Sequence, residues 1–238
     1  MKTRKPVSIL LILALVLGIL PCGVLSARAD AAVFALADGI GGNGSGNGVL
    51  TRMEPVAYQA WIGSAVADAE PCTSYTVVTS GDTVWSTGWY VVNGNLENTN
   101  RITVSDTVNL ILCDNAALSA KKGIAVASGN TLNVYAQSAG ETTGALVIDD
   151  VDAENAGVGG TGKGDVCGAV NIHGGTVSAK SGLHSSGIGG CGVGGSAELA
   201  GGVLKVDRGD DSNQRVIEGG LTVAQGYTYR LVSYFFFS

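Results

Sequence analysis

The chain has 238 residues, of which 37 are glycine, 4 are proline and 45% are hydrophobic. This composition excludes a collagen, because no Gly-X-Y period runs through the chain, and a disordered protein, because valine, isoleucine and leucine are plentiful. The charge balance is acidic, with 20 aspartates and glutamates against 14 lysines and arginines, so the chain lacks the basic footprint that a nucleic-acid partner requires.

Residues 1–29 have the pattern of a secretory signal peptide. Three cations near the N-terminus precede an apolar stretch at residues 7–20, and Ala27-Arg28-Ala29 supplies a small-residue cleavage site. The apolar stretch is short for a bilayer span. We therefore expect a secreted or cell-surface protein with no transmembrane span once the signal is removed.

Residues 30–70 are expected to form a linker followed by a cap. Residues 38–48, DGIGGNGSGNG, have the composition of a flexible linker. Residues 57–70, AYQAWIGSAVADAE, have mixed character, and we expect a short cap helix there. The remaining chain, residues 71–238, is taken as one domain. It ends soon after GGLTVAQGYTYRLVS, which favours truncation at the C-terminus.

From Tyr75 onward the pattern is that of short β-strands. Segments rich in β-branched residues are bounded by Gly, Asn, Ser or Asp, and helical periodicity is nearly absent. Apolar residues alternate clearly at Val108, Leu110 and Leu112. The chain is therefore predicted to be all-β. The strand segments include SYTVVTS, GWYVVNG, RITVS, TVNLILCD, GIAVAS, TLNVYAQ and GALVIDD.

Glycine-rich turns repeat along these strands. AGVGG at residues 156–160 is echoed by SGIGG at residues 186–190, and GGTVSA at residues 174–179 is echoed by GGVLKV at residues 201–206. Glycine corners and short strands at such a spacing are typical of a solenoid, in which each lap of chain needs neighbours to cover its apolar row. We predict a right-handed parallel β-helix over residues 71–238 with an N-terminal cap. The alternative is a β-sandwich.

Residues 88–148, from GWYVVNGNLENTN to GALVI, resemble an opening module of secreted bacterial surface proteins. The later segments GVGG, NIHGGTVSA and SGIGG fit the laps of the same group. This is the pectate-lyase-like right-handed β-helix group of carbohydrate-binding-domain or adhesin-like proteins from gut Firmicutes. The resemblance covers the chain from Gly88 to about Glu218. It implies a secreted or cell-surface β-helix and carries no catalytic signature.

Asp149, Asp150 and Asp152 form the densest acidic cluster in the chain. Carboxylate oxygens are ligands that Ca²⁺ prefers, so these residues are candidates for a calcium site. In polysaccharide lyases of similar shape, calcium neutralises a uronate. The alternative is a solvated acidic loop between strands.

Trp85, Trp89 and Tyr90 lie together before the main run of strands. Flat aromatic rings stack on sugars, so these residues are glycan-binding candidates, with Trp85 foremost because it adjoins an STG turn. The alternative, which we favour, is that the rings plug the open end of the solenoid.

Removal of the leader leaves Cys72, Cys113, Cys167 and Cys191, which allow three pairings. Cys167 and Cys191 are separated by close to one repeat of the glycine-rich turns, and they are the candidate disulfide. The alternative is that the cysteines are buried thiols. No CxxC motif is present, which disfavours a zinc site.

These features favour a non-catalytic module that binds a polysaccharide or a host or cell-surface glycan along one face of a β-helix. Two alternatives stay open. One is a polysaccharide lyase or hydrolase, with Ca²⁺ as its cofactor in the lyase case. The other is a structural spacer of a larger adhesin.

Overall fold

The computed structural model describes residues 53–223, apart from residues 63–64, 164, 192–194, 200–201, 208–215 and 218. The predicted signal peptide, the linker and the C-terminal end lie outside these residues. Within the described part every regular element is a β-strand, which confirms the all-β prediction. This part of the chain holds no helix of the length and apolar character that a membrane span needs.

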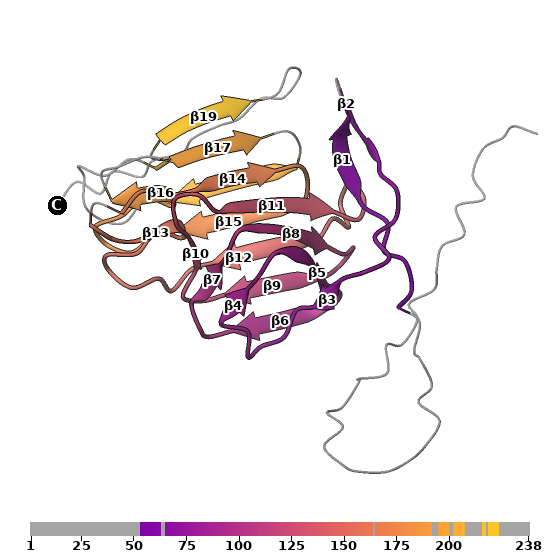
Figure 1. Cartoon of the computed structure of the whole chain (residues 1–238), viewed down its shortest axis with the longest axis horizontal. Coiled ribbons are helices and arrows are strands. Elements are labelled where there is room, and N and C mark those ends of the chain that lie inside the picture. The colour runs from indigo at the N-terminus through magenta and orange to yellow at the C-terminus, as the bar shows by residue number, and fades with distance from the viewer. Residues whose placement is uncertain are drawn as a thin grey trace, which may run out of the picture. The chain divides into compact units, whose positions relative to one another are not determined.

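The strands form three sheets whose neighbouring strands along each stack are parallel (Figure 1). Sheet A contains β3 (Thr76–Val77), β5 (Gly88–Val92), β8 (Thr107–Leu112), β11 (Thr131–Ala136), β14 (Ala169–Ile172), β17 (Gly195–Leu199) and β19 (Gly219–Val223). Sheet B contains β4 (Val84–Trp85), β7 (Ile102–Val104), β10 (Ile124–Val126), β13 (Val158–Lys163) and β16 (Ile188–Cys191). Sheet C contains β6 (Asn95–Asn98), β9 (Ala117–Ala120), β12 (Ala145–Ile148), β15 (Thr176–Lys180) and β18 (Val203–Asp207).

From β5 to β18 the chain visits sheets A, C and B in fixed rotation, so each strand from β5 to β15 pairs with the strand three elements later. We call each set of three consecutive strands, one per sheet, a lap. The echoes seen in the sequence coincide with the pairing register, since Val158 pairs with Ile188 and Thr176 pairs with Val203. The sheets of a β-sandwich are antiparallel, so that alternative is wrong.

The main core lies between the three sheets. Buried positions alternate along the strands, as in β11, where Leu132, Val134 and Ala136 are buried and the residues between them are half-buried. One contiguous cluster joins side chains from all three sheets, including Leu132 of sheet A, Leu146 of sheet C and Val158 of sheet B. Each buried row therefore gains its cover from the laps before and after it.

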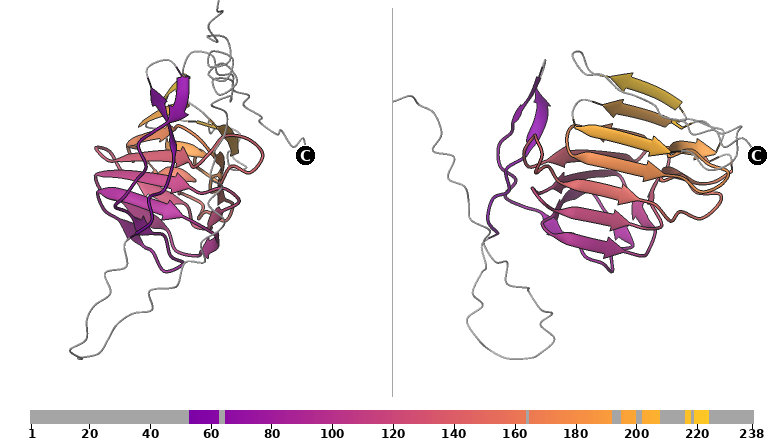
Figure 2. Two further views of the ribbon diagram at one scale, coloured as in Figure 1. Left: turned by 90° about the vertical axis from the view of Figure 1, so that its right-hand side faces the viewer. Right: turned by 180° about the vertical axis from the view of Figure 1, so that it is seen from behind.

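The predicted cap helix is wrong, because the segment forms strands β1 (Gln59–Ile62) and β2 (Ala65–Asp68). These strands pair antiparallel, and β1 joins β11 through Gln59 and Ala136 (Figure 2). The register pairs Ile62 with Ala65, so β1 and β2 are adjacent antiparallel strands, and short apolar segments of this kind are ambiguous between helix and strand in sequence.

A second, smaller apolar cluster lies on the outer face of sheet A. Val56, Cys72 and Tyr75 pack there against Val91 of β5 and Ile111 of β8. The residues before the first lap therefore cover part of one side of sheet A.

Glycine is required where neighbouring laps approach each other most closely. Gly159 of β13 has a φ of 139°, and a Cβ added there would collide with the carbonyl oxygen of Gly189, its partner in the next lap. Gly157 and Gly187 show the same crowding, since a Cβ on Gly157 would lie 2.7 Å from the Gly187 oxygen. The repeated GxGG segments are therefore places of close backbone contact and need no bound ligand to explain them.

This packing predicts the effect of a methyl group at Gly159. Gly159→Ala is expected to lower the free energy of unfolding by about 2–3 kcal/mol. The matched control is Gly94→Ala, where an added Cβ meets no atom within 4 Å, and the expected change is below about 0.5 kcal/mol. Urea unfolding followed by circular dichroism measures both values, and equal stability of the two variants would contradict the close approach of the laps.

Candidate functional site

The outer face of sheet A carries a ladder of three asparagines. Asn109, Asn133 and Asn171 occupy paired positions on β8, β11 and β14. The Nδ2 group of Asn171 donates a hydrogen bond of 2.8 Å to Oδ1 of Asn133, and Nδ2 of Asn133 donates one of 2.8 Å to Oδ1 of Asn109. The ladder therefore runs across the strands, along the direction in which the laps stack.

The amides face outward because the residues beside them face inward. In β8 the flanking side chains of Val108 and Leu110 are fully buried in the main core, whereas Asn109 is half-buried. Each asparagine is the third residue of its strand, in TVNLIL, TLNVYA and AVNI. The ladder was not predicted from the sequence, although aligning the three strands on their apolar residues would have revealed it.

The ladder keeps hydrogen-bonding capacity for a ligand. A primary amide has two N–H donors and two acceptor lone pairs on its oxygen. Asn133, in the middle, uses one donor toward Asn109 and one lone pair toward Asn171. Its second donor and second lone pair remain for partners on the open side, which makes the ladder a row of alternating donors and acceptors.

An aromatic group adjoins the ladder. Trp89 of β5 pairs with Asn109, so its indole stands at the next position along the same row. The ring centroid of Tyr135 lies 5.4 Å from that of Trp89, and Tyr58 packs on both rings at 4.8 and 5.2 Å. His173 stacks on Tyr135, with centroids 4.7 Å apart and planes 8° apart. Amides and half-buried rings thus share one surface.

Charged residues are absent from the outward positions of β5, β8, β11 and β14. These positions hold aromatic, aliphatic, hydroxyl or amide residues, with no aspartate, glutamate, lysine or arginine among them. They are Trp89, Val91, Thr107, Asn109, Ile111, Thr131, Asn133, Tyr135, Ala169 and Asn171.

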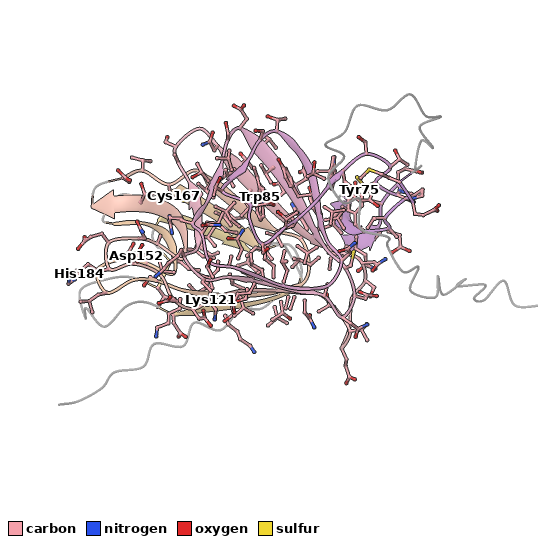
Figure 3. All side chains as sticks on the ribbon, turned by 90° about the horizontal axis from the view of Figure 1, so that it is seen from below. Tyr75, Trp85, Lys121, Asp152, Cys167 and His184 are labelled. Carbon is pink, nitrogen blue, oxygen red and sulfur yellow. The ribbon has the colours of Figure 1, made fainter. Side chains whose placement is uncertain are left out.

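The three aromatic residues predicted to bind glycan differ in their burial and in the face of the sheet on which they lie. Trp85 has 0% exposure and its Nε1 donates a 2.9 Å hydrogen bond to Asp82, so its prediction as a sugar-stacking residue is wrong. Tyr90 packs against the main core, with its ring 5.4 Å from that of Trp85 (Trp85 is labelled in Figure 3). Of the three, Trp89 alone lies on the outer face, because strand alternation sends neighbouring residues to opposite sides.

The carboxylates predicted to bind calcium are paired with lysines. Asp149 lies 3.1 Å from Nζ of Lys121, while Asp150 and Asp152 lie 3.2 and 3.3 Å from Nζ of Lys122. The hydrogen bond to Asp149 raises the pKa of the Lys121 ammonium. Among the described residues, no group of three or more metal-ligating side chains is placed to hold an ion.

The lysines come from the preceding lap, at a separation that the sequence alone does not connect. Lys121 and Asp149 are far apart along the chain, and only the pairing of β9 with β12 brings their corners together. In Figure 3 Asp152 lies between Lys121 and His184, and Tyr75 lies toward the other end of the molecule. These charges belong to a corner of the laps and are separate from the asparagine ladder.

Cys167 is a buried free thiol in the structure. The side chain of Cys191 lies outside the described residues, so the disulfide between Cys167 and Cys191 stays a prediction. Burial raises the pKa of the Cys167 thiol to about 11, although a hydrogen bond from the backbone N–H of Gly189 opposes the rise. Burial also raises the pKa of Cys113 to about 11.

A cavity of about 410 Å³ lies beside β10 and β13. Asp165 is its charged lining residue among those described, and its carboxylate accepts hydrogen bonds from the backbone N–H and the hydroxyl of Thr161, at 3.1 and 2.8 Å. The Asp165 carboxylate and the Thr161 hydroxyl are thus hydrogen-bonded to each other. The lining residues are Ala127, Ser128, Gly159, Gly160, Thr161, Asp165 and Val166.

Arg101 is largely enclosed and makes its hydrogen bonds with backbone. Its guanidinium donates to the carbonyl oxygens of Lys122, Ala156 and Gly160, at 2.7, 3.0 and 3.0 Å. Burial lowers its pKa to about 10. Because these carbonyls belong to later turns of the chain, Arg101 ties successive laps together.

No protein-family model, curated protein or solved structure matches the chain. Among the surfaces described above, the ladder and its aromatic group combine open hydrogen-bonding capacity with apolar rings.

The different burial of the two tryptophans predicts different effects on stability. Trp85→Ala is expected to cost about 3–5 kcal/mol of unfolding free energy, because it removes a large core side chain. Trp89→Ala is expected to cost less, because Trp89 is half-buried. Urea unfolding of the two variants tests this order. A larger loss for Trp89→Ala would show that Trp85 is not the core residue.

The raised thiol pKa values predict slow alkylation. At pH 8 a thiol with a pKa near 11 is ionised in about one molecule in a thousand, and the thiolate is the reactive form. Cys113 and Cys167 should therefore react with iodoacetamide far more slowly in the native protein than in urea. Peptide mass spectrometry measures each site, and equal rates in both conditions would contradict their burial.

Proposed function

We propose that the chain is a non-catalytic carbohydrate-binding module of a secreted or cell-surface protein. Its binding surface is the outer face of sheet A, where the asparagine ladder meets Trp89 and Tyr135. The observation that carries this proposal is the amide row beside half-buried rings, on strands whose outward positions hold no charged residue from β5 to β14.

The architecture that supports this surface is a right-handed parallel β-helix of the pectate-lyase-like group. The fixed rotation through three parallel sheets and the shared core between them support this proposal. In such a solenoid each sheet offers a long outer face, on which equivalent positions of successive laps form straight rows.

The chemistry of the surface suits a sugar. Sugar hydroxyls both donate and accept hydrogen bonds, as do the amides of Asn109, Asn133 and Asn171. The C–H faces of a pyranose are apolar and pack on aromatic rings, a role available to Trp89. Polar groups fix orientation and apolar rings exclude water in small-molecule sites generally.

Two observations count against the lyase alternative. A lyase needs a base of lowered pKa facing the substrate. Arg101 has a lowered pKa, but its guanidinium is turned toward three backbone carbonyls. The predicted calcium ligands pair with Lys121 and Lys122.

Glycan binding is tested with variants that change one outer face at a time. Trp89→Ala and Asn133→Ala should each weaken binding to a polysaccharide recognised by the intact protein, with Trp89→Ala losing about tenfold in affinity. Ser178→Ala, a half-buried position on sheet C, is the control and should bind normally. Glycan arrays identify the ligand, titration calorimetry gives the affinities, and thermal melting verifies folding.

Two results would contradict the proposed function. One is the absence of binding to every polysaccharide by the folded, intact protein. The other is equal affinity of the Trp89→Ala, Asn133→Ala and Ser178→Ala variants. Either would favour the spacer alternative, in which the ladder only holds the laps together.

A further inference from the structure

We propose that the sheet A surface binds a neutral, extended polysaccharide with equatorial linkages, lying along the asparagine ladder. This inference rests on the proposed function, and it names the class of glycan and its direction on the protein. It is carried by three features: the charge of the face, the direction of the ladder, and the cluster that covers part of sheet A.

The charge of the face selects against acidic glycans. The outward residues of β5, β8, β11 and β14 include no lysine or arginine that could pair with a uronate or sulfate. Lys121 and Lys122 are engaged by carboxylates at another corner. An anionic sugar on the ladder would lose hydration without gaining a counter-charge, which is costly.

The cluster over sheet A sets the direction of the chain. Along the strands, the positions that follow Trp89 and Asn109 on this face are Val91 and Ile111, which are covered by the cluster containing Val56. A ligand that ran along the strands would meet that cluster. A ligand that runs across the strands instead meets the three amides, with Trp89 at the end of the row, where its ring packs against Tyr58 at the border of this cluster.

The spacing of the rungs suits an extended chain. Neighbouring parallel strands lie about 4.8 Å apart, close to the length of one pyranose residue in an extended, equatorially linked polymer. Asn109, Asn133 and Asn171 are therefore placed to contact successive sugar residues, while Trp89 stacks on a fourth at one end. A helical α-linked glucan curves away from a straight row and cannot follow it over this length.

The test compares the affinity of oligosaccharides by titration calorimetry. The probes are β-1,4-linked gluco-, xylo- and manno-oligosaccharides from dimer to hexamer, malto-oligosaccharides of the same lengths, and oligogalacturonates with and without Ca²⁺. We expect at least one neutral β-1,4 series to bind, with affinity rising to the tetramer and constant beyond it. Maltohexaose and the galacturonates should bind at least about tenfold more weakly.

Variants locate the two ends of the chain. Asn171→Ala should lower affinity for the tetramer about fivefold, the worth of one hydrogen bond, and leave the dimer unchanged. Trp89→Ala should weaken binding of every length. Ser178→Ala, on sheet C, should leave the whole series unchanged, and thermal melting shows that each variant is folded.

The outcomes separate this inference from the proposed function. Tighter binding of galacturonates, equal binding of maltohexaose, or affinity that does not grow beyond the dimer would overturn the inference and leave the carbohydrate-binding function standing. Binding of no glycan by the folded protein would overturn both.

Discussion

In-register parallel pairing between strands three elements apart places the side chains of the stacked sheets. Because strands of successive laps are parallel and in register, equivalent residues stand directly above one another, as Asn109, Asn133 and Asn171 do. The inner rows are aliphatic, one outer row holds three asparagines beside Trp89, and glycine stands where the laps crowd. The aliphatic rows stabilise the register by excluding water. The asparagine row does so by hydrogen bonding between laps, and the glycine positions allow the backbones to approach closely.

The same constraint gives the outer faces their different characters. At the corner that follows sheet C, Lys121 and Asp149 of successive laps form an ion pair, an exposed interaction that contributes little to stability. On sheet A the corresponding stacking creates an uncharged strip of amides bordered by rings. Repetition of the lap thus extends this strip from β8 to β14, one amide for each lap.

The parts of the structure that depend on local pattern were predictable from the sequence. Alternating apolar residues predicted the strands, and the echoes of AGVGG and GGTVSA predicted stacked laps. In the structure the echoed residues pair with each other, Val158 with Ile188 and Thr176 with Val203. Of the glycines predicted to form corners, Gly174 and Gly175 lie between β14 and β15, whereas Gly159 and Gly189 lie within β13 and β16. These features were accessible because they repeat, and each repeat is a separate observation of the same geometry.

Features that depend on contact between residues far apart in the chain could not be predicted from the local sequence pattern. Lys121 and Asp149 meet only once β9 and β12 are paired, and Trp85 and Trp89 could be distinguished only by knowing which side of its strand each occupies. The hairpin of β1 and β2 was mistaken for a helix because its short apolar segment is ambiguous in periodicity. The asparagine ladder was the one site feature that the sequence contained in full.

The most direct test of the stacked, parallel arrangement is solution NMR of the isotopically labelled protein. Parallel, in-register laps place the amide of Val203 in a 2.8 Å hydrogen bond with Gly175 and the amide of Val158 in a 2.9 Å bond with Gly187. The account predicts cross-strand nuclear Overhauser contacts that link β15 with β18 and β13 with β16, with the short amide-to-α-proton pattern of parallel strands. Short contacts between opposing α-protons of the same strands, or contacts in another register, would contradict it.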